Sequence, residues 1–222
     1  MQSIKPKWIK RILVLFIVIF ISYILYLNSL VKSQFSSEIE PKDNVVQIQN
    51  LIDDYPKELI NMLLLVEDQS FFDHKGVDFK EILRVLYGYL FEEKELRGAS
   101  TITQQLIKNT LLSRDKTLAR KTDEALMAIL MEMSYDKNFI LERYMNTVYL
   151  AQQGSTAIHG FASGSLHYFD KDVESLNLEE MATLVALLKG PSYYNPVNSP
   201  DRLSRRVEMI LSMHKNYKKI IQ

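Results

Sequence analysis

A long apolar run near the N-terminus constrains the fold of this chain more than any other feature. From Ile12 to Leu27 it is broken only by Ser22 and softened by two tyrosines, and extension to Val31 gives about 20 residues. That is the length that crosses a bilayer as a helix. Because the run is apolar on all sides, it does not suit a one-sided helix of a soluble core. We predict a transmembrane helix over residues 12–31.

Charges on either side of the run predict its orientation. Basic residues within 5–11 precede it, whereas Glu38, Glu40 and Asp43 follow it. By the positive-inside rule, residues 1–11 form a cytoplasmic tail and the rest of the chain lies outside the membrane. A cleaved signal peptide is the alternative, but the run is long for one and no Ala-x-Ala site follows it.

Composition narrows the class of protein. The chain has 222 residues, and its 27 basic and 27 acidic side chains give a formal net charge of zero. A nucleic-acid-binding protein usually shows a basic excess, so this balance argues against that class. Cysteine is absent, which excludes disulfides and thiolate metal sites, and the four histidines lack the spacing of a zinc motif.

Helical periodicity dominates the remainder of the chain. Residues 32–50 are polar and are predicted to be a linker. The expected helices cover about 56–66, 79–91, 106–112, 118–133, 139–150, 176–190 and 201–219. Residues 152–165 are rich in Gly and Ser and are predicted to form a loop. Alternating β patterns are scarce, so we expect one mostly helical domain of about 165 residues.

The first candidate for chemistry is the acidic pair Glu67 and Asp68, which follows four apolar residues. Burial raises the pKa of a carboxylate, which suits a group that transfers protons near neutral pH. Phe71, His74 and Gly76 then form the turn that follows. The alternative is an ordinary helix end with an exposed acidic pair.

The second candidate is a polar cluster after Gly98. It consists of Ser100, Thr101, Thr103, Gln104 and Gln105. Hydroxyl and carboxamide groups can bind sugar hydroxyls or phosphate oxygens, and a helix starting here would add free N–H groups for an anion. The alternative is an extended N-cap, which explains Ser100 or Thr101 but not all five residues.

The third candidate is a basic cluster. It consists of Lys108, Arg114, Lys116, Arg120 and Lys121. Such a cluster could neutralise a diphosphate. A solvated charged face is the alternative, with Glu124 paired to Arg120 one helical turn away.

Taken in order, five segments resemble motifs of glycosyltransferase family 51, the peptidoglycan glycosyltransferases. They are EDQSFFDHKG (67–76), GASTITQQLIKN (98–109), RKTDE (120–124), KNFILERYMNTVYL (137–150) and RRVEMIL (205–211). The resemblance covers about residues 53–213. Residues 149–169 are closer to one subgroup of bifunctional penicillin-binding proteins. Asp170 departs from the family, which usually has Gly there, so we expect a local loop change.

The resemblance implies a lysozyme-like helical fold with a large lobe and a small membrane-proximal jaw lobe. The domain would cover residues 51–213, followed by a tail at 214–222. It would be anchored in the bacterial cytoplasmic membrane by the single helix. The implied reaction polymerises lipid II into β-1,4-linked glycan with inversion and releases a polyprenyl diphosphate. Other cell-wall synthesis or division proteins are further possible partners.

The resemblance also implies roles for particular residues. Glu67 would be the general base, and Glu124 the second catalytic carboxylate. Substrate would be bound by Asp68, Phe71, His74, Gly76, Gly98, Ser100, Thr101, Thr103, Gln104, Gln105, Lys108, Lys116, Arg120 and Lys121. A divalent cation, Mg²⁺ or Mn²⁺, would bridge Glu124 to the diphosphate, or Glu124 would orient the basic side chains; the sequence leaves both open. No organic cofactor is implied.

The apolar segment 82–91 would press against the bilayer as part of the jaw lobe, with Tyr87, Tyr89 and Phe91 at the interface. A plain core helix is the alternative for this segment.

Three other functions are considered. A transpeptidase is not expected, because two S-x-x-K matches lie inside the transferase motifs, no K-T-G appears, and about 30 residues remain after Gly190. The chain is therefore expected to be monofunctional, or else a fragment of a longer protein. A lysozyme-like lytic enzyme needs a protonated acid and has no use for the basic cluster. An inactive membrane-anchored scaffold would not need Glu67 and Glu124.

Overall fold

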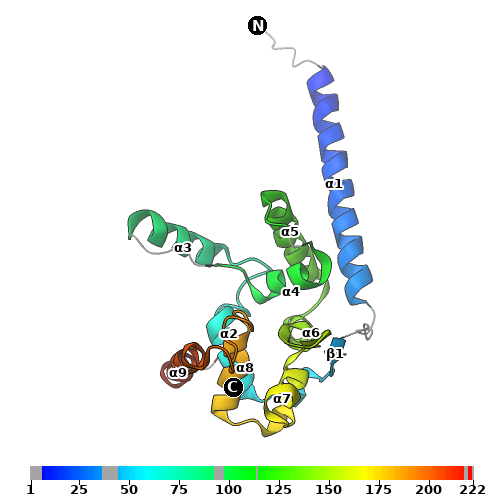
Figure 1. Ribbon diagram of the computed structural model, residues 1–222. Helices are drawn as coiled ribbons and strands as arrows, with labels where there is room; N and C mark the ends of the chain where they lie inside the picture. Colours follow the sequence, from blue (N-terminus) through cyan, green and yellow to red (C-terminus); the bar gives the residue numbers. More distant parts are fainter. Residues whose placement is uncertain (1–6, 37–44, 93–97, 114, 218–219, 222) are drawn as a thin grey trace.

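The computed structural model describes residues 7–36, 45–92, 98–113, 115–217 and 220–221. Arg114 of the basic cluster lies outside these residues, as do residues 1–6 of the predicted tail and 37–44 of the predicted linker. Figure 1 shows one long helix, α1 (Lys7–Phe35), extending away from a body of shorter helices. The predicted mostly helical domain behind a single apolar helix is confirmed.

Helix α1 is exposed over its first part and buries one face of its last part. From Trp8 to Phe35 it is long and apolar enough to cross a membrane, judged by length and composition. Leu27, Val31 and Phe35 recur every four residues, are buried, and lie on the helix that packs against α5 (Leu118–Ser134). The last turn was predicted to be linker. It stays helical because its apolar face is anchored in the core.

The other helices form the body. They are α2 (Lys57–Glu67), α3 (Phe79–Phe91), α4 (Ile102–Leu111), α6 (Lys137–Thr147), α7 (Phe161–Phe169), α8 (Leu178–Leu187) and α9 (Pro200–Asn216), with short 3₁₀ turns at Ile52–Asp54 and Val173–Ser175. Helix α2 packs against α8 and α9, and α4 packs between α5 and α6. Asn177 caps α8 as the pattern suggests, accepting from the Glu180 N–H at 2.9 Å.

Helix α4 begins four residues before its predicted start at Leu106. Thr101 Oγ1 accepts from the Gln104 N–H at 3.1 Å, and Gln104 Oε1 accepts from the Thr101 N–H at 3.2 Å. This reciprocal capping box satisfies two N–H groups that the first turn would otherwise leave unpaired. Thr101 and Gln104, two members of the polar cluster, therefore form the N-terminal cap of α4.

The predicted loop at 152–165 is wrong. Strand β2 (Tyr149–Gln153) pairs antiparallel with β3 (Thr156–His159), and β1 (Val45–Gln47) pairs in parallel with β3, giving the order β1-β3-β2. Strands of three to five residues are too short to show a clear alternating pattern. Gly154, with a φ of +60°, lies in the turn between β2 and β3 and contributed to the loop-like composition.

Helix α7 has a loop-like composition because close packing requires small residues. A Cβ on Gly164 would lie 2.6 Å from the side chain of Leu150. Ser163 is buried, and its hydroxyl accepts from the Ile48 N–H at 2.7 Å. Gly and Ser here indicate contact between elements rather than mobility.

The local loop change expected at Asp170 stays a prediction, but the structure shows how this residue ends α7. Asp170 adopts the left-handed conformation, with φ of 53° and ψ of 42°, and its N–H caps α7 by donating to the Leu166 carbonyl at 3.0 Å. Gly is the residue best suited to this conformation, but Asp also tolerates it. The helix end that Gly would form is thus kept.

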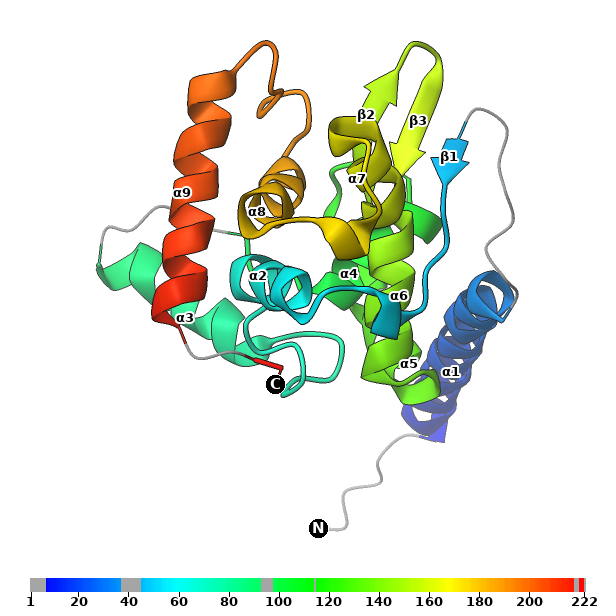
Figure 2. The same ribbon diagram turned by 90° about the horizontal axis from the view of Figure 1, so that it is seen from below.

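Helix α3 is exposed along nearly its whole length. Gly88 is its one buried residue, whereas Leu83 is 66% exposed and Phe91 is 72% exposed. A core helix would bury such side chains, so the core-helix alternative is wrong. Figures 1 and 2 place α3 and α1 on opposite sides of α4 and α5.

Candidate active site

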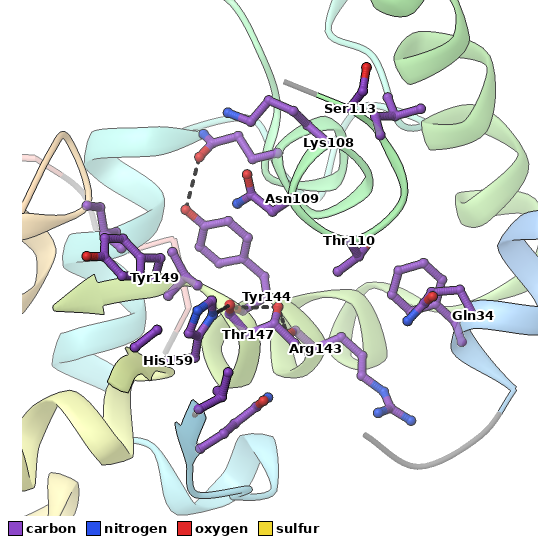
Figure 3. Close-up of a pocket in the computed structure, with 18 of the residues that line it drawn as sticks. Gln34, Lys108, Asn109, Thr110, Ser113, Arg143, Tyr144, Thr147, Tyr149 and His159 are labelled. Carbon is purple, nitrogen blue, oxygen red and sulfur yellow. Dashed lines mark hydrogen bonds between the residues drawn. The ribbon is translucent and has the colours of Figure 1, made fainter. Parts of the chain in front are cut away.

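A groove of about 1320 Å³ lies between α4, α6, the β2–β3 hairpin and the end of α1. Figure 3 shows Lys108 and Asn109 of α4 facing Arg143 of α6 across it, with Tyr149 near one end and Gln34 of α1 near the other. It is lined by both polar and apolar side chains. A groove of this size could take several sugar rings or an extended chain.

Glu67 is the last residue of α2 and is half-buried. Its Oε2 accepts a hydrogen bond from Gln105 Nε2 at 3.0 Å. Gln105 itself lines the groove. The predicted base therefore lies next to the groove, hydrogen-bonded to the uncharged amide of a residue that lines it.

Gln105 is held from its other side by Tyr144 of α6. The Tyr144 hydroxyl donates to Gln105 Oε1 at 3.1 Å, the bond drawn at Tyr144 in Figure 3. Tyr144 is 1% exposed. Burial first, and then the negative charges of Glu67 and Asp68, raise the pKa of the Tyr144 hydroxyl well above its usual value.

Asp68 points into the interior instead. It is buried, accepts from the Ile102 N–H at 2.9 Å, and contacts His74 Nε2 at 3.0 Å. The other His74 nitrogen lies 3.7 Å from Glu132, which pairs with Lys137 at 2.7 Å. Asp68 and His74 therefore hold the start of α4 against α5, and neither lines the groove.

Several other predicted substrate-binding residues are likewise not among those that line the groove. Phe71 and Thr103 are fully buried, and the Thr103 hydroxyl donates to Glu132 at 2.6 Å. Thr101 and Gln104 form the helix cap already described. Gly76 has a φ of +84°, and a Cβ there would lie 2.5 Å from the backbone of α5. These residues place α4 and do not line the groove.

Three of the predicted cations line the groove. Lys108 comes from α4, Lys116 from the segment before α5, and Arg120 from the first turn of α5. Lys121 is not among the groove-lining residues, and it donates to Ser100 Oγ at 2.7 Å. Gly98 is exposed, and nothing near it would meet a Cβ.

Glu124 contacts two of the predicted cations, Arg120 and Lys121, and is 1% exposed. Its Oε2 accepts from Arg120 Nη1 at 2.7 Å, and its Oε1 accepts from Lys121 Nζ. Both carboxylate oxygens thus face cations. In the described part of the chain, no three His, Cys, Asp or Glu side chains gather as an all-protein metal site would need. A cation that bridges Glu124 to the diphosphate stays a prediction, because one carboxylate together with substrate phosphates can hold Mg²⁺.

Sequence reasoning missed several groove residues. Tyr144 was not singled out because it lies three and four residues after Leu141 and Ile140, the spacing of a buried helix face. Only its hydroxyl distinguishes it from an ordinary core residue. Tyr149 and His159 lie on the hairpin that was not predicted. Arg143 is adjacent to Tyr144 in a motif that the sequence analysis quoted, and that was the available signal.

Comparisons with known proteins agree with the motifs. A family model described as Transglycosylase matches residues 33–215. Penicillin-binding protein 1B of Haemophilus influenzae is 41% identical over 178 residues, which is 80% of this chain and 23% of that protein. Penicillin-binding protein 1B of Escherichia coli K12 is 42% identical over 159 residues, which is 72% of this chain and 19% of that protein.

A third relative, penicillin-binding protein 1F of Bacillus subtilis, is 39% identical over 162 residues, which is 73% of this chain and 22% of that protein. The chain spans about a fifth of the length of these relatives.

Proposed function

The chain belongs to the transglycosylase family, and from that premise we propose that it is a peptidoglycan glycosyltransferase. It joins lipid II units into β-1,4-linked glycan with inversion and releases a polyprenyl diphosphate. Its helical domain behind one apolar helix fits the lysozyme-like fold that the resemblance implies. The observation that carries the proposal is one groove flanked by a carboxylate and lined by cations.

The reaction assigns a separate task to each group. Glu67 takes the proton of the 4-hydroxyl of the acceptor lipid II as that oxygen attacks the anomeric carbon of the donor glycan. The bond from this carbon to the diphosphate oxygen breaks on the opposite face, which inverts the configuration. Lys108, Lys116 and Arg120 stabilise the negative charge that develops on the departing diphosphate.

Glu124 acts on the cations in this scheme. Its contacts with Arg120 and Lys121 fix two flexible side chains before substrate arrives. Of the two roles that the sequence left open, orientation of the basic side chains is the one its contacts favour.

The lipid part of the substrate explains the apolar surfaces. Helix α1 anchors the chain as a single-pass helix with its N-terminus in the cytoplasm, and α3 lies on the outer surface of the bilayer. Single-cysteine variants Ser3→Cys and Ser155→Cys test the orientation in intact cells, because the natural chain has no cysteine. A membrane-impermeant maleimide should label only position 155; labelling at position 3 would contradict the orientation.

The deciding experiment incubates the full chain with labelled lipid II, with and without a chelator. Formation of polymer supports the transferase. Cleavage of preformed glycan without polymer would instead support the lytic enzyme, and neither activity would support the scaffold. The cations lining the groove are what favour the transferase over the lytic enzyme. Association with other cell-wall proteins stays a prediction.

A further inference from the structure

Three side chains from three helices form a continuous hydrogen-bonded row that ends at the proposed base. Tyr144 of α6 donates to Gln105 of α4 at 3.1 Å, and Gln105 donates to Glu67 at the end of α2 at 3.0 Å. We propose that Tyr144 and Gln105 are positioning residues that fix the Glu67 carboxylate at the edge of the groove. This inference rests on the proposed function for the role of Glu67.

The row has a direction because its two ends differ chemically. An ionised carboxylate only accepts hydrogen bonds, so the Gln105 amide must turn its NH₂ group toward Glu67. Its carbonyl oxygen then faces Tyr144 and needs a donor. The Tyr144 hydroxyl supplies that donor, and the reversed amide would bring its oxygen against the carboxylate. Tyr144 therefore selects one of two amide orientations.

The surroundings of Tyr144 keep it a donor. It is buried, and both burial and the nearby carboxylates raise its pKa, so its hydroxyl stays protonated at any pH at which the enzyme works. Its neighbours Ile140 and Leu141 are also buried in the core. The donor thus sits on a rigid element, whereas Gln105 is partly exposed and could otherwise rotate.

Through this row, α6 contributes to the position of the Glu67 carboxylate as well as to the core. An N–H donated to a carboxylate favours its ionised form, which is the form that can accept the proton of the acceptor hydroxyl. The same hydrogen bond holds Glu67 Oε2 in place, which limits the rotation of the Glu67 side chain. Tyr144 itself does not take part in the proton transfer.

A double-mutant cycle tests the inference with Tyr144→Phe, Gln105→Met and the two combined. Each single variant should lower kcat about tenfold, which is the size of one hydrogen bond, with KM for lipid II within about twofold. The double variant should be no slower than Gln105→Met, because Tyr144 acts only through the amide. Losses that multiply in the double variant would overturn the inference.

The matched control is Tyr168→Phe, which also removes a partly buried hydroxyl, one that donates to the Leu150 carbonyl at 3.0 Å. It should leave kcat within about twofold. A fall in kcat for Tyr168→Phe as large as that for Tyr144→Phe would mean that Tyr144 is merely structural.

A measurement without substrate separates this inference from the proposed function. In protein labelled with ¹³C-glutamate, the infrared difference against Glu67→Gln isolates the Glu67 carboxylate band. The antisymmetric stretch of this carboxylate should change frequency in Tyr144→Phe and in Gln105→Met, because the Glu67 carboxylate then loses or weakens the hydrogen bond from Gln105. An unshifted band in both variants would refute the inference, whether or not the protein polymerises lipid II.

Discussion

Glu67 and Glu124 are both carboxylates assigned to one active site, yet their surroundings differ. Glu67 is half-buried and receives a neutral amide N–H from Gln105. Glu124 is 1% exposed and is contacted by the cations of Arg120 and Lys121, one on each oxygen. Glu67 thus faces an uncharged donor, whereas both oxygens of Glu124 are occupied by cations. The contacts therefore separate the base from the residue that positions the cations.

The largest expected effect is that of Glu67→Gln. It removes the proton acceptor but keeps the size of the side chain and its place beside Gln105. We expect polymerisation to fall about 10³-fold, within the range of general-base catalysis, while binding of inorganic pyrophosphate stays intact. Steady-state rates on lipid II and calorimetric titration measure the two quantities.

The matched control for this variant is Asp73→Asn, which neutralises an exposed carboxylate six residues away. It should keep nearly full activity. Full activity in Glu67→Gln would remove Glu67 from the mechanism.

Glu124→Gln should have the next largest effect. Unlike Glu67→Gln, it should weaken the binding of pyrophosphate as well as turnover. Without the charge of Glu124, Arg120 and Lys121 lose the partner that orients them. We expect both pyrophosphate binding and turnover to fall, by about tenfold to a hundredfold.

A chelator sharpens this second prediction. If Glu124 acts on the cations, then removal of divalent ions should change the natural chain and Glu124→Gln by the same factor. A loss on chelation that is present in the natural chain and absent from the variant would instead make Glu124 a metal ligand.

The comparison also shows how far the sequence could predict the site. The sequence could pair Glu124 with Arg120, because residues four apart on a helix lie on one face. It could not show that Gln105 reaches Glu67, because that contact joins α4 to the end of α2 and depends on where Asp68 holds the Ile102 N–H. Local spacing was informative, and contacts between distant segments were not.

The polar cluster after Gly98 carries the same lesson. Its composition suggested that five side chains face a ligand, but Thr101, Thr103 and Gln104 are buried in the cap and first turn of α4. Ser, Thr and Gln serve helix starts and ligands alike, since both need hydrogen-bonding groups. Most helices were predicted well because their periodicity is long, whereas helix α7 and the short β2–β3 hairpin were missed.

Lys108→Ala tests the role of the groove-lining cations and should have a smaller effect than the two glutamate variants. Lys108 is exposed and lines the groove. We expect pyrophosphate binding and turnover each to weaken about tenfold. Lys215→Ala on α9, also an exposed lysine, is the control and should change either quantity less than twofold. Equal effects of the two variants would mean that Lys108 is only a solvated charge.

The smallest expected effect concerns Asp170, a carboxylate outside the groove. Its left-handed φ of 53° at the end of α7 makes its backbone conformation matter more than its charge. Asp170→Ala should lower the free energy of unfolding by about 1 kcal/mol, because Ala adopts this conformation poorly. Asp170→Gly should not lower it, since Gly adopts the conformation without a steric cost. Both variants should polymerise lipid II at the natural rate, as measured beside their chemical denaturation. Equal destabilisation in the two would show that the carboxylate itself is needed, and lost activity in either would extend the site beyond Glu67 and Glu124.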